Sequence, residues 1–512
     1  MNLRFSTWGR AMFAAMLVGA CLSCSKDDDS NTVDPGGTNA DGSVTIDSVA
    51  FASTAPEGDT GIAADEEDVL ANSTFSSVVS IHFGSTVAIT NPLEGNGVAV
   101  TETNGDVVIT ATVAAVEYVL SGTTANGSVK IYSDKKFKLS LNGVSITNAD
   151  GPAVNIQSEK RAFIVLNDNT TNSLTDGGSY TASGDEDMKA TLFGEGQMIF
   201  SGAGTLNLKS NYKHAICSDD YVRIISGNIV VTGAASDGIH TNDAFIADGG
   251  TVSITAAGDG IQCEEGYIVI NNGNFTVNVV DKAITASWDT DSSINPFVTI
   301  NGGTFNIKSS VGEGIESKSV LTINNGDFNI QTADDGLNAG SFIYINGGNI
   351  YVYSTSNDGI DSNGPMTITG GRIVSIAAGG PEEGFDCDRN TFKITGGILI
   401  GTGGATSSPT ASVSTQPSVI LGSGQANQLM HIRSSDGKEA MTFTIPRAYN
   451  TMLFSSPKLK QGTTYQVYTG GSVAGTTDFH GLYITGVYTA GTAGTSFTTS
   501  SMVTNAGGSQ GR

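Results

Sequence analysis

An acidic residue followed by glycine and a large apolar residue recurs along the chain between Ser236 and Gly403. The copies begin at Asp237, Asp259, Glu313, Asp335, Asp358 and Glu383, with a degenerate copy at Asp281. A second polar position stands three residues further on and holds His240, Gln262, Glu316, Asn338, Asp361 and Asp386. Most of these side chains carry the oxygen ligands that hard divalent cations prefer in proteins.

The spacing of the acids predicts that they stand above one another in the fold. Their period is about 23 residues, the length of one coil in a repeat protein. Equivalent residues on neighbouring coils of stacked strands lie about 4.8 Å apart, so ionised carboxylates would repel one another and their pKa values would rise. Ca²⁺ would remove that repulsion, because it accepts about six to eight oxygen ligands in irregular geometry.

We therefore expect calcium ligands among the acids of these coils. The candidates are Asp219, Asp220, Asp237, Asp243, Asp259, Asp281, Glu313, Glu316, Asp334, Asp335, Asp358, Asp361 and Asp386. The alternative for any single copy is an Asp that caps a turn by accepting backbone N–H groups. The glycine that follows each acid predicts a positive φ at a corner of the coil.

Each repeat contains about three apolar runs of three to five residues separated by turns. Strands this short pair best with the equivalent strand one coil later, which predicts an all-β fold. We expect a right-handed parallel β-helix of three sheets with about 22–25 residues per coil, the handedness following the usual crossover preference. A β-propeller needs about 40 residues or more per blade, so the period is too short for it.

One step of the repeat, between Asp281 and Glu313, is about ten residues longer than its neighbours. The extra residues predict a loop that bulges from one corner of the coil and carries Trp288. A Trp on such a loop suits stacking on a sugar ring, although it could equally cover a coil edge.

The N-terminus predicts export. Residues 1–23 combine basic residues, a short apolar run and small residues before Cys24, which resembles a bacterial lipoprotein signal and the start of Bacteroidetes surface lipoproteins. Cys24 is the expected lipidated residue, with Cys21 as the competing site. Residues 24–44 are expected to be a flexible tether, which places the protein on the bacterial outer membrane at the cell surface.

Residues 45–410 are predicted to form the β-helix, and residues 411–512 a C-terminal β module or cap, because an open solenoid end would expose its core. The formal net charge of −25 argues against nucleic acid and anionic membrane surfaces as partners and leaves the lipid anchor as the membrane contact. Cys217, Cys263 and Cys387 suit a packed interior rather than disulfides.

The sequence shows no nucleophile elbow, phosphate loop or zinc-binding helix, so no catalytic residue is assigned. A lyase acting on uronates would need a lysine base beside Ca²⁺, for which Lys282 and Lys318 are the nearby candidates. Solvent-exposed lysines are the alternative interpretation. His214 and His240 occupy near-equivalent coil positions and are expected to serve turns.

From about Tyr118 to Phe385 the chain resembles the bacterial surface family of calcium-binding, carbohydrate-binding parallel β-helix proteins. The resemblance rests on residues 139–146 (LSLNGVSI), residues 202–206 (GAGTL), Asp219-Asp220 and the Asp-Gly-Ile copies. It implies binding of pectic or cellulosic polysaccharide, a fold related to calcium-dependent polysaccharide lyases, and Ca²⁺ at Asp-Asp-Gly motifs. The first Asp of that motif survives in Asp334-Asp335-Gly336 and is replaced by Ser236, Gly258 and Asn357 in other copies, which implies fewer or weaker sites here.

We expect a cell-surface lipoprotein that binds a polysaccharide, in particular an acidic glycan, with Ca²⁺ and without chemistry of its own. The alternatives are a calcium-dependent uronate lyase and a structural adhesin.

Overall fold

The computed structural model describes residues 42–48 and 53–511. The signal, Cys24 and nearly all of the tether lie outside these residues. The described part is all-β, and its helical segments are two short 3₁₀ helices, η1 (Glu66–Asp68) and η2 (Leu70–Asn72). Among the described residues no helix has the length and apolar character needed to span a bilayer.

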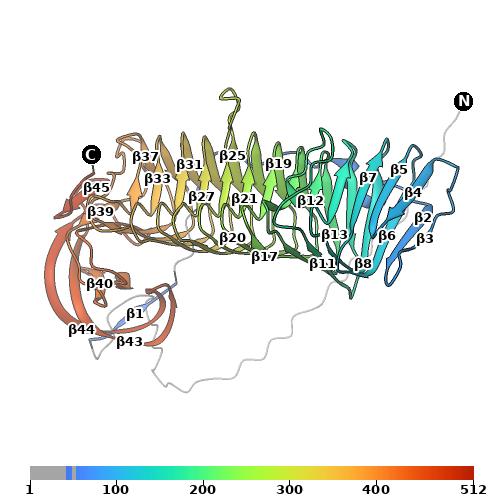
Figure 1. Ribbon diagram of the computed structural model, residues 1–512. Helices are drawn as coiled ribbons and strands as arrows, with labels where there is room; N and C mark the ends of the chain where they lie inside the picture. Colours follow the sequence, from blue (N-terminus) through green and yellow to red (C-terminus); the bar gives the residue numbers. More distant parts are fainter. Residues whose placement is uncertain (1–41, 49–52, 512) are drawn as a thin grey trace, which may run out of the picture. The chain divides into compact units, whose positions relative to one another are not determined.

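Three series of short parallel strands stack coil upon coil, as Figure 1 shows. The first sheet has 13 strands and is parallel except for its first pair, β4 and β5. Its strands are β4 (Val98–Thr103), β5 (Asp106–Ala111), β7 (Ser128–Ser133), β9 (Val154–Gln157), β12 (Ala190–Gly194), β15 (His214–Ser218), β18 (Ile239–Thr241), β21 (Ile261–Cys263), β24 (Ile284–Ala286), β27 (Ile315–Ser317), β30 (Leu337–Ala339), β33 (Ile360–Ser362) and β36 (Phe385–Asp386).

The second and third sheets share the long strands β6 and β8, so they form one connected ladder. The second sheet holds β2 (Ser77–Phe83) with β3 (Ala88–Thr90) antiparallel to it, then β6 (Val116–Thr124), β8 (Phe137–Thr147), β10 (Ala162–Leu166), β13 (Met198–Gly202), β16 (Tyr221–Ile224), β19 (Ala244–Ala247), β22 (Tyr267–Ile270), β25 (Phe297–Ile300), β28 (Val320–Ile323), β31 (Phe342–Ile345), β34 (Met366–Ile368) and β37 (Phe392–Ile394). The third sheet continues from β8 through β11 (Thr171–Thr175), β14 (Thr205–Lys209), β17 (Asn228–Ala234), β20 (Thr251–Ala256), β23 (Asn274–Val279), β26 (Thr304–Ser309), β29 (Asp327–Thr332), β32 (Asn349–Ser354), β35 (Arg372–Ile376) and β38 (Ile398–Gly403). The predicted parallel β-helix of three sheets is confirmed.

The core consists of columns of like residues that point inward on successive coils. Ile239, Ile261, Ile284 and Ile315 pair in register in the first sheet and are fully buried. In the third sheet Phe275, Phe305 and Phe328 stack with ring centroids 5.1 and 4.6 Å apart. Such columns form because a strand of three to six residues cannot bury apolar surface without the coils above and below it. All three described cysteines are buried, as predicted.

The glycines after the repeating acids are required by close packing, and the expected positive φ is wrong. A Cβ atom added at Gly336 would lie 1.9 Å from Val352 Cγ1, and one added at Gly238 would lie 2.5 Å from Ile254 Cγ2. The positive φ values fall instead on the other repeating glycines, such as Gly303 and Gly326, at φ 108° and 134°. The first sheet therefore packs too closely on the third to admit a side chain beside each acid.

A C-terminal β module follows the last coil. Its strands are β39 (Ser418–Leu421), β40 (Leu429–Ser434), β41 (Glu439–Thr444), β42 (Thr451–Ser455), β43 (Thr464–Phe479), β44 (Leu482–Thr498) and β45 (Val503–Ala506). Strand β42 pairs antiparallel with β38, so the module covers the end of the third sheet. Strand β1 (Val44–Ile46), although first in the chain, pairs with β44 in the module.

A polar segment at 53–72, here called the strap, runs back along the coils from the late ones to the early ones. Thr54 N donates to Thr369 O at 3.1 Å, and the side chains of Asn346, Asn324 and Asn301 donate to strap carbonyls at 2.7, 3.0 and 2.9 Å. In the acidic cluster at 65–68, Asp65, Glu66 and Glu67 are exposed and Asp68 is buried. Asp68 is 1% exposed and pairs with Arg161 at 2.8 Å and with Arg223 at 2.9 Å.

The outer face of the first sheet is covered at its early coils and open at its later ones. Residues of the loop between β11 and β12 contact β7 and β9: Lys130 Nζ donates to Ser183 Oγ at 2.9 Å, and Gln157 Nε2 donates to Asp187 O at 2.9 Å. Beyond β15 no loop among residues 42–48 and 53–511 crosses the strands in this way. The face from β18 to β36 is therefore the part of this sheet that can meet a large ligand.

Replacing Phe305 by Ala should destabilise the stack by about 3–5 kcal/mol, because the deleted ring leaves a cavity between Phe275 and Phe328. Val311→Ala is the matched control, since Val311 is 62% exposed and should change stability by about 0.5 kcal/mol or less. Urea unfolding followed by circular dichroism measures both. Equal effects of the two substitutions would contradict the predicted column.

Candidate functional site

The second polar position of the repeat forms one outward column on the first sheet. Pairing in register joins Cys217, His240, Gln262, Thr285, Glu316, Asn338, Asp361 and Asp386, one residue per coil. The predicted second row therefore exists, with Thr285 at the coil that the repeat left without a polar match. From His240 onward it lies on the open face.

The first acidic position stands at the turn that enters each strand of this sheet. Its carboxylate accepts a hydrogen bond from the backbone N–H of the equivalent residue one coil later: Asp259 N donates to Asp237 Oδ1 at 2.9 Å, and Asp358 N to Asp335 Oδ1 at 3.0 Å. Lys282 N donates in the same way to Asp259 Oδ1 at 2.8 Å. The turn-capping alternative therefore applies here, but it uses one carboxylate oxygen and leaves the other free for a second partner.

The first group on the open face is the histidine cluster, made of His214, Asp237, His240 and Glu264. Asp237 Oδ2 lies 3.0 Å from His214 Nδ1 and 3.1 Å from His240 Nδ1, and His240 Nε2 lies 3.0 Å from Glu264 Oε2. Burial opposes ionisation of Asp237, but the contacts with both histidines outweigh it and hold its pKa below the usual range. Burial also acts against a charged His240, yet Asp237 and Glu264 raise its pKa to about 9.

His214 occupies the acidic position of its own coil. Ile216 pairs with Ile239, so the triplet from His214 to Ile216 is an earlier copy of the triplet from Asp237 to Ile239. Sequence reasoning assigned both histidines to turns and missed the cluster. The signal that could have found it is this substitution of His for Asp in the repeat.

The second group surrounds Glu316, which is nearly fully buried. Lys318 Nζ lies 2.5 Å from Glu316 Oε1, Lys282 Nζ lies 3.1 Å from Oε2, and Thr285 Oγ1 donates to Oε2 at 2.9 Å. Burial favours neutral Lys282, but the charges of Glu316 and Glu313 outweigh it and raise its pKa. A general base needs a lowered pKa, so the two lysines predicted for a lyase neutralise Glu316 instead.

The third group is the carboxylate cluster, made of Asp335, Asn338, Asp358, Asp361 and Asp386. Carboxylate oxygens of Asp358, Asp361 and Asp386 lie within 4.8 Å of one another. Asn338 Nδ2 donates to Asp335 Oδ2 at 2.8 Å and to Asp361 Oδ2 at 3.1 Å. Within the described residues, no lysine or arginine forms an ion pair with these four carboxylates.

The pKa values of the buried carboxyl groups in this cluster are raised. Burial, reinforced by the charges of Asp335, Asp358 and Asp386, raises the pKa of Asp361 to about 8. Burial raises the pKa of Asp335 and of Asp358 to about 7, although hydrogen bonds to each carboxylate oppose the shift. The donor set consists of oxygen atoms with excess negative charge, which fits a hard divalent cation such as Ca²⁺.

A family model for a carbohydrate-binding domain-containing protein matches residues 103–359 and 298–473, which together span more than half of the chain. The chain belongs to this carbohydrate-binding family. A relative of the same description from Acetivibrio thermocellus is 32% identical over 118 residues, which are 22% of this chain and 41% of the relative. The alignment thus spans less than half of that relative's length.

Among solved structures, the gadolinium derivative of a polysaccharide lyase-like protein from C. thermocellum is similar to this chain. The sequence identity is 26% and the TM-score is 0.39, over 48% of this chain and 96% of that one.

The remaining predicted metal ligands lie apart from the carboxylate cluster or at its margin. Asp219 pairs with Lys189 at 3.0 Å, and Asp243 N donates to Asp220 O at 2.9 Å in the turns that leave the first sheet. Asp281 is exposed, Glu313 lies 4.0 Å from Lys282 Nζ, and Asp334 accepts from Asn357 Nδ2 at 2.6 Å. The structure therefore brings together Asp335, Asp358, Asp361 and Asp386 but not the full predicted row.

Trp288 is half-buried at the start of the predicted loop, which joins β24 to β25 and stands out from the coils beside β25 in Figure 1. The loop is held against the edge of the open face, because Thr290 Oγ1 donates to Glu265 Oε1 at 2.6 Å and Asp289 N donates to the same oxygen at 3.2 Å. The insertion therefore lies next to Glu264 and the histidine cluster.

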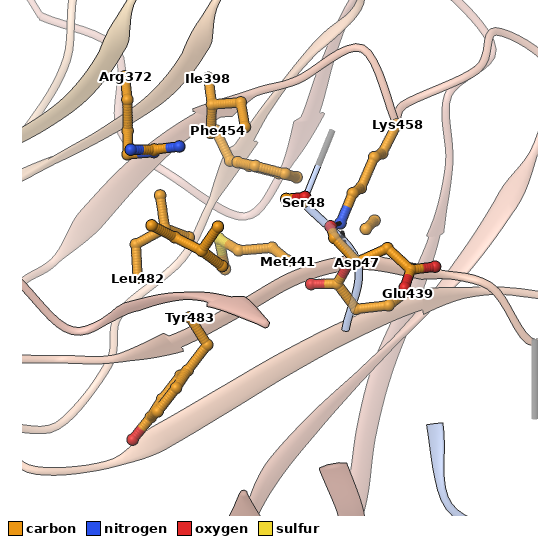
Figure 2. A pocket seen from close by; sticks show the side chains of 12 residues that line it. Asp47, Ser48, Arg372, Ile398, Glu439, Met441, Phe454, Lys458, Leu482 and Tyr483 are labelled. Carbon is orange, nitrogen blue, oxygen red and sulfur yellow. Dashed lines mark hydrogen bonds and ion pairs between the residues drawn. The ribbon is translucent and has the colours of Figure 1, made fainter. Parts of the chain in front are cut away.

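A separate pocket in the C-terminal module is too small for a sugar. In Figure 2 Lys458 points toward Asp47 and Glu439, and Lys458 Nζ donates to Asp47 O at 2.8 Å while it pairs with Glu439. The space open to the centre of a water molecule is about 20 Å³, which suffices for about one water. The hydrogen bond from Lys458 to Asp47 O ties the residue after β1 to the module.

The carboxylate cluster should make stability fall as the pH rises when divalent cations are chelated. The carboxyl pKa of Asp361 is about 8 in the folded protein and about 4 when unfolded, so the folded state holds the extra proton between these values. Its favourable contribution is complete below pH 4 and is lost as the pH approaches 8. Between pH 5 and pH 8 the wild type should lose about 1–2 kcal/mol more than Asp361→Asn, which keeps an acceptor for Asn338. Urea unfolding in EDTA measures this difference, and parallel profiles for the two proteins would refute it.

Proposed function

We propose that this protein binds an acidic polysaccharide through Ca²⁺ held at the carboxylate cluster, on the open face of the first sheet. The observation that carries the proposal is the set of four carboxylates, which within the described part of the chain have no cationic partner and lie on a face that no loop covers. Asp358, Asp361 and Asp386 would supply carboxylate ligands, and Asn338 orients two of the acids. Buried like charges are costly without a cation, so the cluster favours binding of one. Ca²⁺ accepts about six to eight ligands, so it would keep coordination positions open to a glycan.

An acidic glycan is the proposed ligand because a bound Ca²⁺ ion can bridge its carboxylates to the acidic face of the protein. The chain carries a formal net charge of −25 and would repel an anionic polymer directly. A Ca²⁺ ion that keeps free coordination positions after binding to the face can accept oxygens from uronate carboxylates and hydroxyls. The ion would then join two acidic surfaces, which makes retention dependent on calcium.

Binding without catalysis is favoured over the uronate lyase by the state of the two lysines. Lys282 and Lys318 are both held by Glu316, and the raised pKa of Lys282 keeps it protonated. A purely structural adhesin would not need a column of uncompensated carboxylates on its open face. We place the protein on the outer surface of a bacterial outer membrane, anchored through a lipid on Cys24, from the signal-like residues 1–23.

Calcium should be required for retention on polygalacturonate beads, and Asp361→Asn or Asp358→Asn should lower retention at least tenfold at limiting Ca²⁺, because each removes a charged ligand. Asp327→Asn is the matched control: Asp327 is an exposed acid at the start of β29 on another sheet. Retention that survives EDTA would refute the calcium bridge. Unsaturated product released from polygalacturonate would instead favour the lyase.

Trp288→Ala should weaken retention on the same beads while leaving Ca²⁺ binding by calorimetry unchanged, because Trp288 lies outside the carboxylate cluster and would act through ring stacking. Trp288→Phe should restore part of the retention, since it keeps an aromatic face. If both variants bind glycan as the wild type does, Trp288 covers the coil edge and takes no part in binding.

A further inference from the structure

We propose that the histidine cluster is a second metal site, one that binds a divalent transition-metal ion such as Zn²⁺ or Co²⁺. The ligands would be His214, Asp237 and His240, with Glu264 supporting His240. This inference is independent of polysaccharide binding. Strand β18 precedes β33 by five coils, which places the two sites about 24 Å apart along the sheet.

Asp237 Oδ2 already stands close to a nitrogen of each histidine, at separations near those in a metal site. Donor atoms of His214, Asp237 and His240 lie within 4.8 Å of one another, and Asp237 Oδ2 is 3.0 and 3.1 Å from the two Nδ1 atoms. Ligands in a tetrahedral zinc site with bonds of about 2.0 Å lie about 3.3 Å apart. Seating an ion among them also requires the two stacked imidazole rings to tilt, because each nitrogen binds a metal in the plane of its ring.

His214 supplies a buried nitrogen that lacks a hydrogen bond. Its side chain is 10% exposed, and Nδ1 makes no hydrogen bond although Asp237 Oδ2 is only 3.0 Å away. Its ring stacks on that of His240, with centroids 4.2 Å apart and planes inclined by 27°. Buried polar atoms nearly always have a partner, and a cation among these donors would provide one for Nδ1.

Glu264 gives His240 the arrangement that metal-binding histidines show. His240 turns Nδ1 toward Asp237 and Nε2 toward Glu264 Oε2 at 3.0 Å. A ligating histidine commonly donates its other ring N–H to a carboxylate, which fixes the tautomer and strengthens the metal bond. Metal binding replaces the proton on Nδ1 and leaves the Nε2–H bonded to Glu264.

The ligand types select a different ion from that of the carboxylate cluster. Two imidazole nitrogens with one carboxylate suit Zn²⁺, Co²⁺ or Ni²⁺, whereas Ca²⁺ takes oxygen ligands. The cluster lines an open depression of about 420 Å³, into which Lys189 and Lys213 also project. An ion can enter from solvent, and its fourth position remains open to water.

Cobalt titration of the purified protein tests the site directly. Calcium-loaded wild type should bind one Co²⁺ with the visible absorption of nitrogen-ligated cobalt, and Zn²⁺ should displace it. His214→Gln and His240→Gln should each weaken Co²⁺ binding at least about tenfold. Circular dichroism establishes that each variant is folded, and His240→Asn replaces any variant that is not.

Two matched variants separate this site from the others. His82→Gln removes an exposed histidine on β2, and Asp358→Asn alters the carboxylate cluster; both should bind Co²⁺ as the wild type does. The proposal is overturned if the wild type shows no nitrogen-ligated spectrum, if excess Ca²⁺ displaces the Co²⁺, or if the His214 and His240 variants keep wild-type affinity. Loss of glycan binding in Asp358→Asn with intact Co²⁺ binding would leave this proposal standing.

Discussion

The stacking of equivalent residues one coil apart is the constraint on which the rest of this structure depends. A strand of three residues such as Ile239–Thr241 has no stable partner within its own coil, so it must pair with its equivalent above and below. Any side chain that the repeat places outward then lies about 4.8 Å from the equivalent side chain on the next coil. Apolar columns gain from this arrangement, as the stacked rings of Phe275, Phe305 and Phe328 show. A column of carboxylates loses from it, because each added copy raises the cost of ionising the others.

Along the open face of the first sheet, the charge of the outward column is compensated to a different degree at three places. Near β18 the histidine at position 240 takes the place of an acid, and Asp237 keeps a low pKa. Near β27 two lysines neutralise Glu316. Near β33 no lysine or arginine of the described residues pairs with the carboxylates, and burial together with the neighbouring charges raises the pKa of Asp361 to about 8. The chemistry of each stretch therefore follows from what compensates the charge there, rather than from the repeat itself, which is nearly the same throughout.

The repeat made both the coil and the outward column predictable, since a regular solenoid brings residues one period apart into register. The column from His240 to Asp386 follows from spacing except at Thr285, because the register places Lys282, and not the predicted Asp281, at the acidic position of that coil. Contacts between segments outside the period could not. The strap's Asp68 pairs with Arg161 and Arg223, yet nothing local in a polar segment indicates which surface it crosses. The same holds for Lys282, whose place in the degenerate copy gave no sign that it would reach Glu316 on the next coil.

The distribution of sites along the sheet bears on the size of the ligand. Trp288 follows β24, and Asp361 lies on β33, three coils further along, which is about 14 Å at the spacing of stacked strands. A single sugar cannot touch both, so the proposed calcium site and the aromatic loop act together only on a glycan several residues long. The coils between them present Glu316 already neutralised by lysines, so this stretch does not repel an anionic chain as the carboxylate cluster would. A rigid face with anchoring groups at two points and a neutral stretch between them suits an extended polymer. Binding to such preformed sites costs less entropy than binding that must first order a flexible surface.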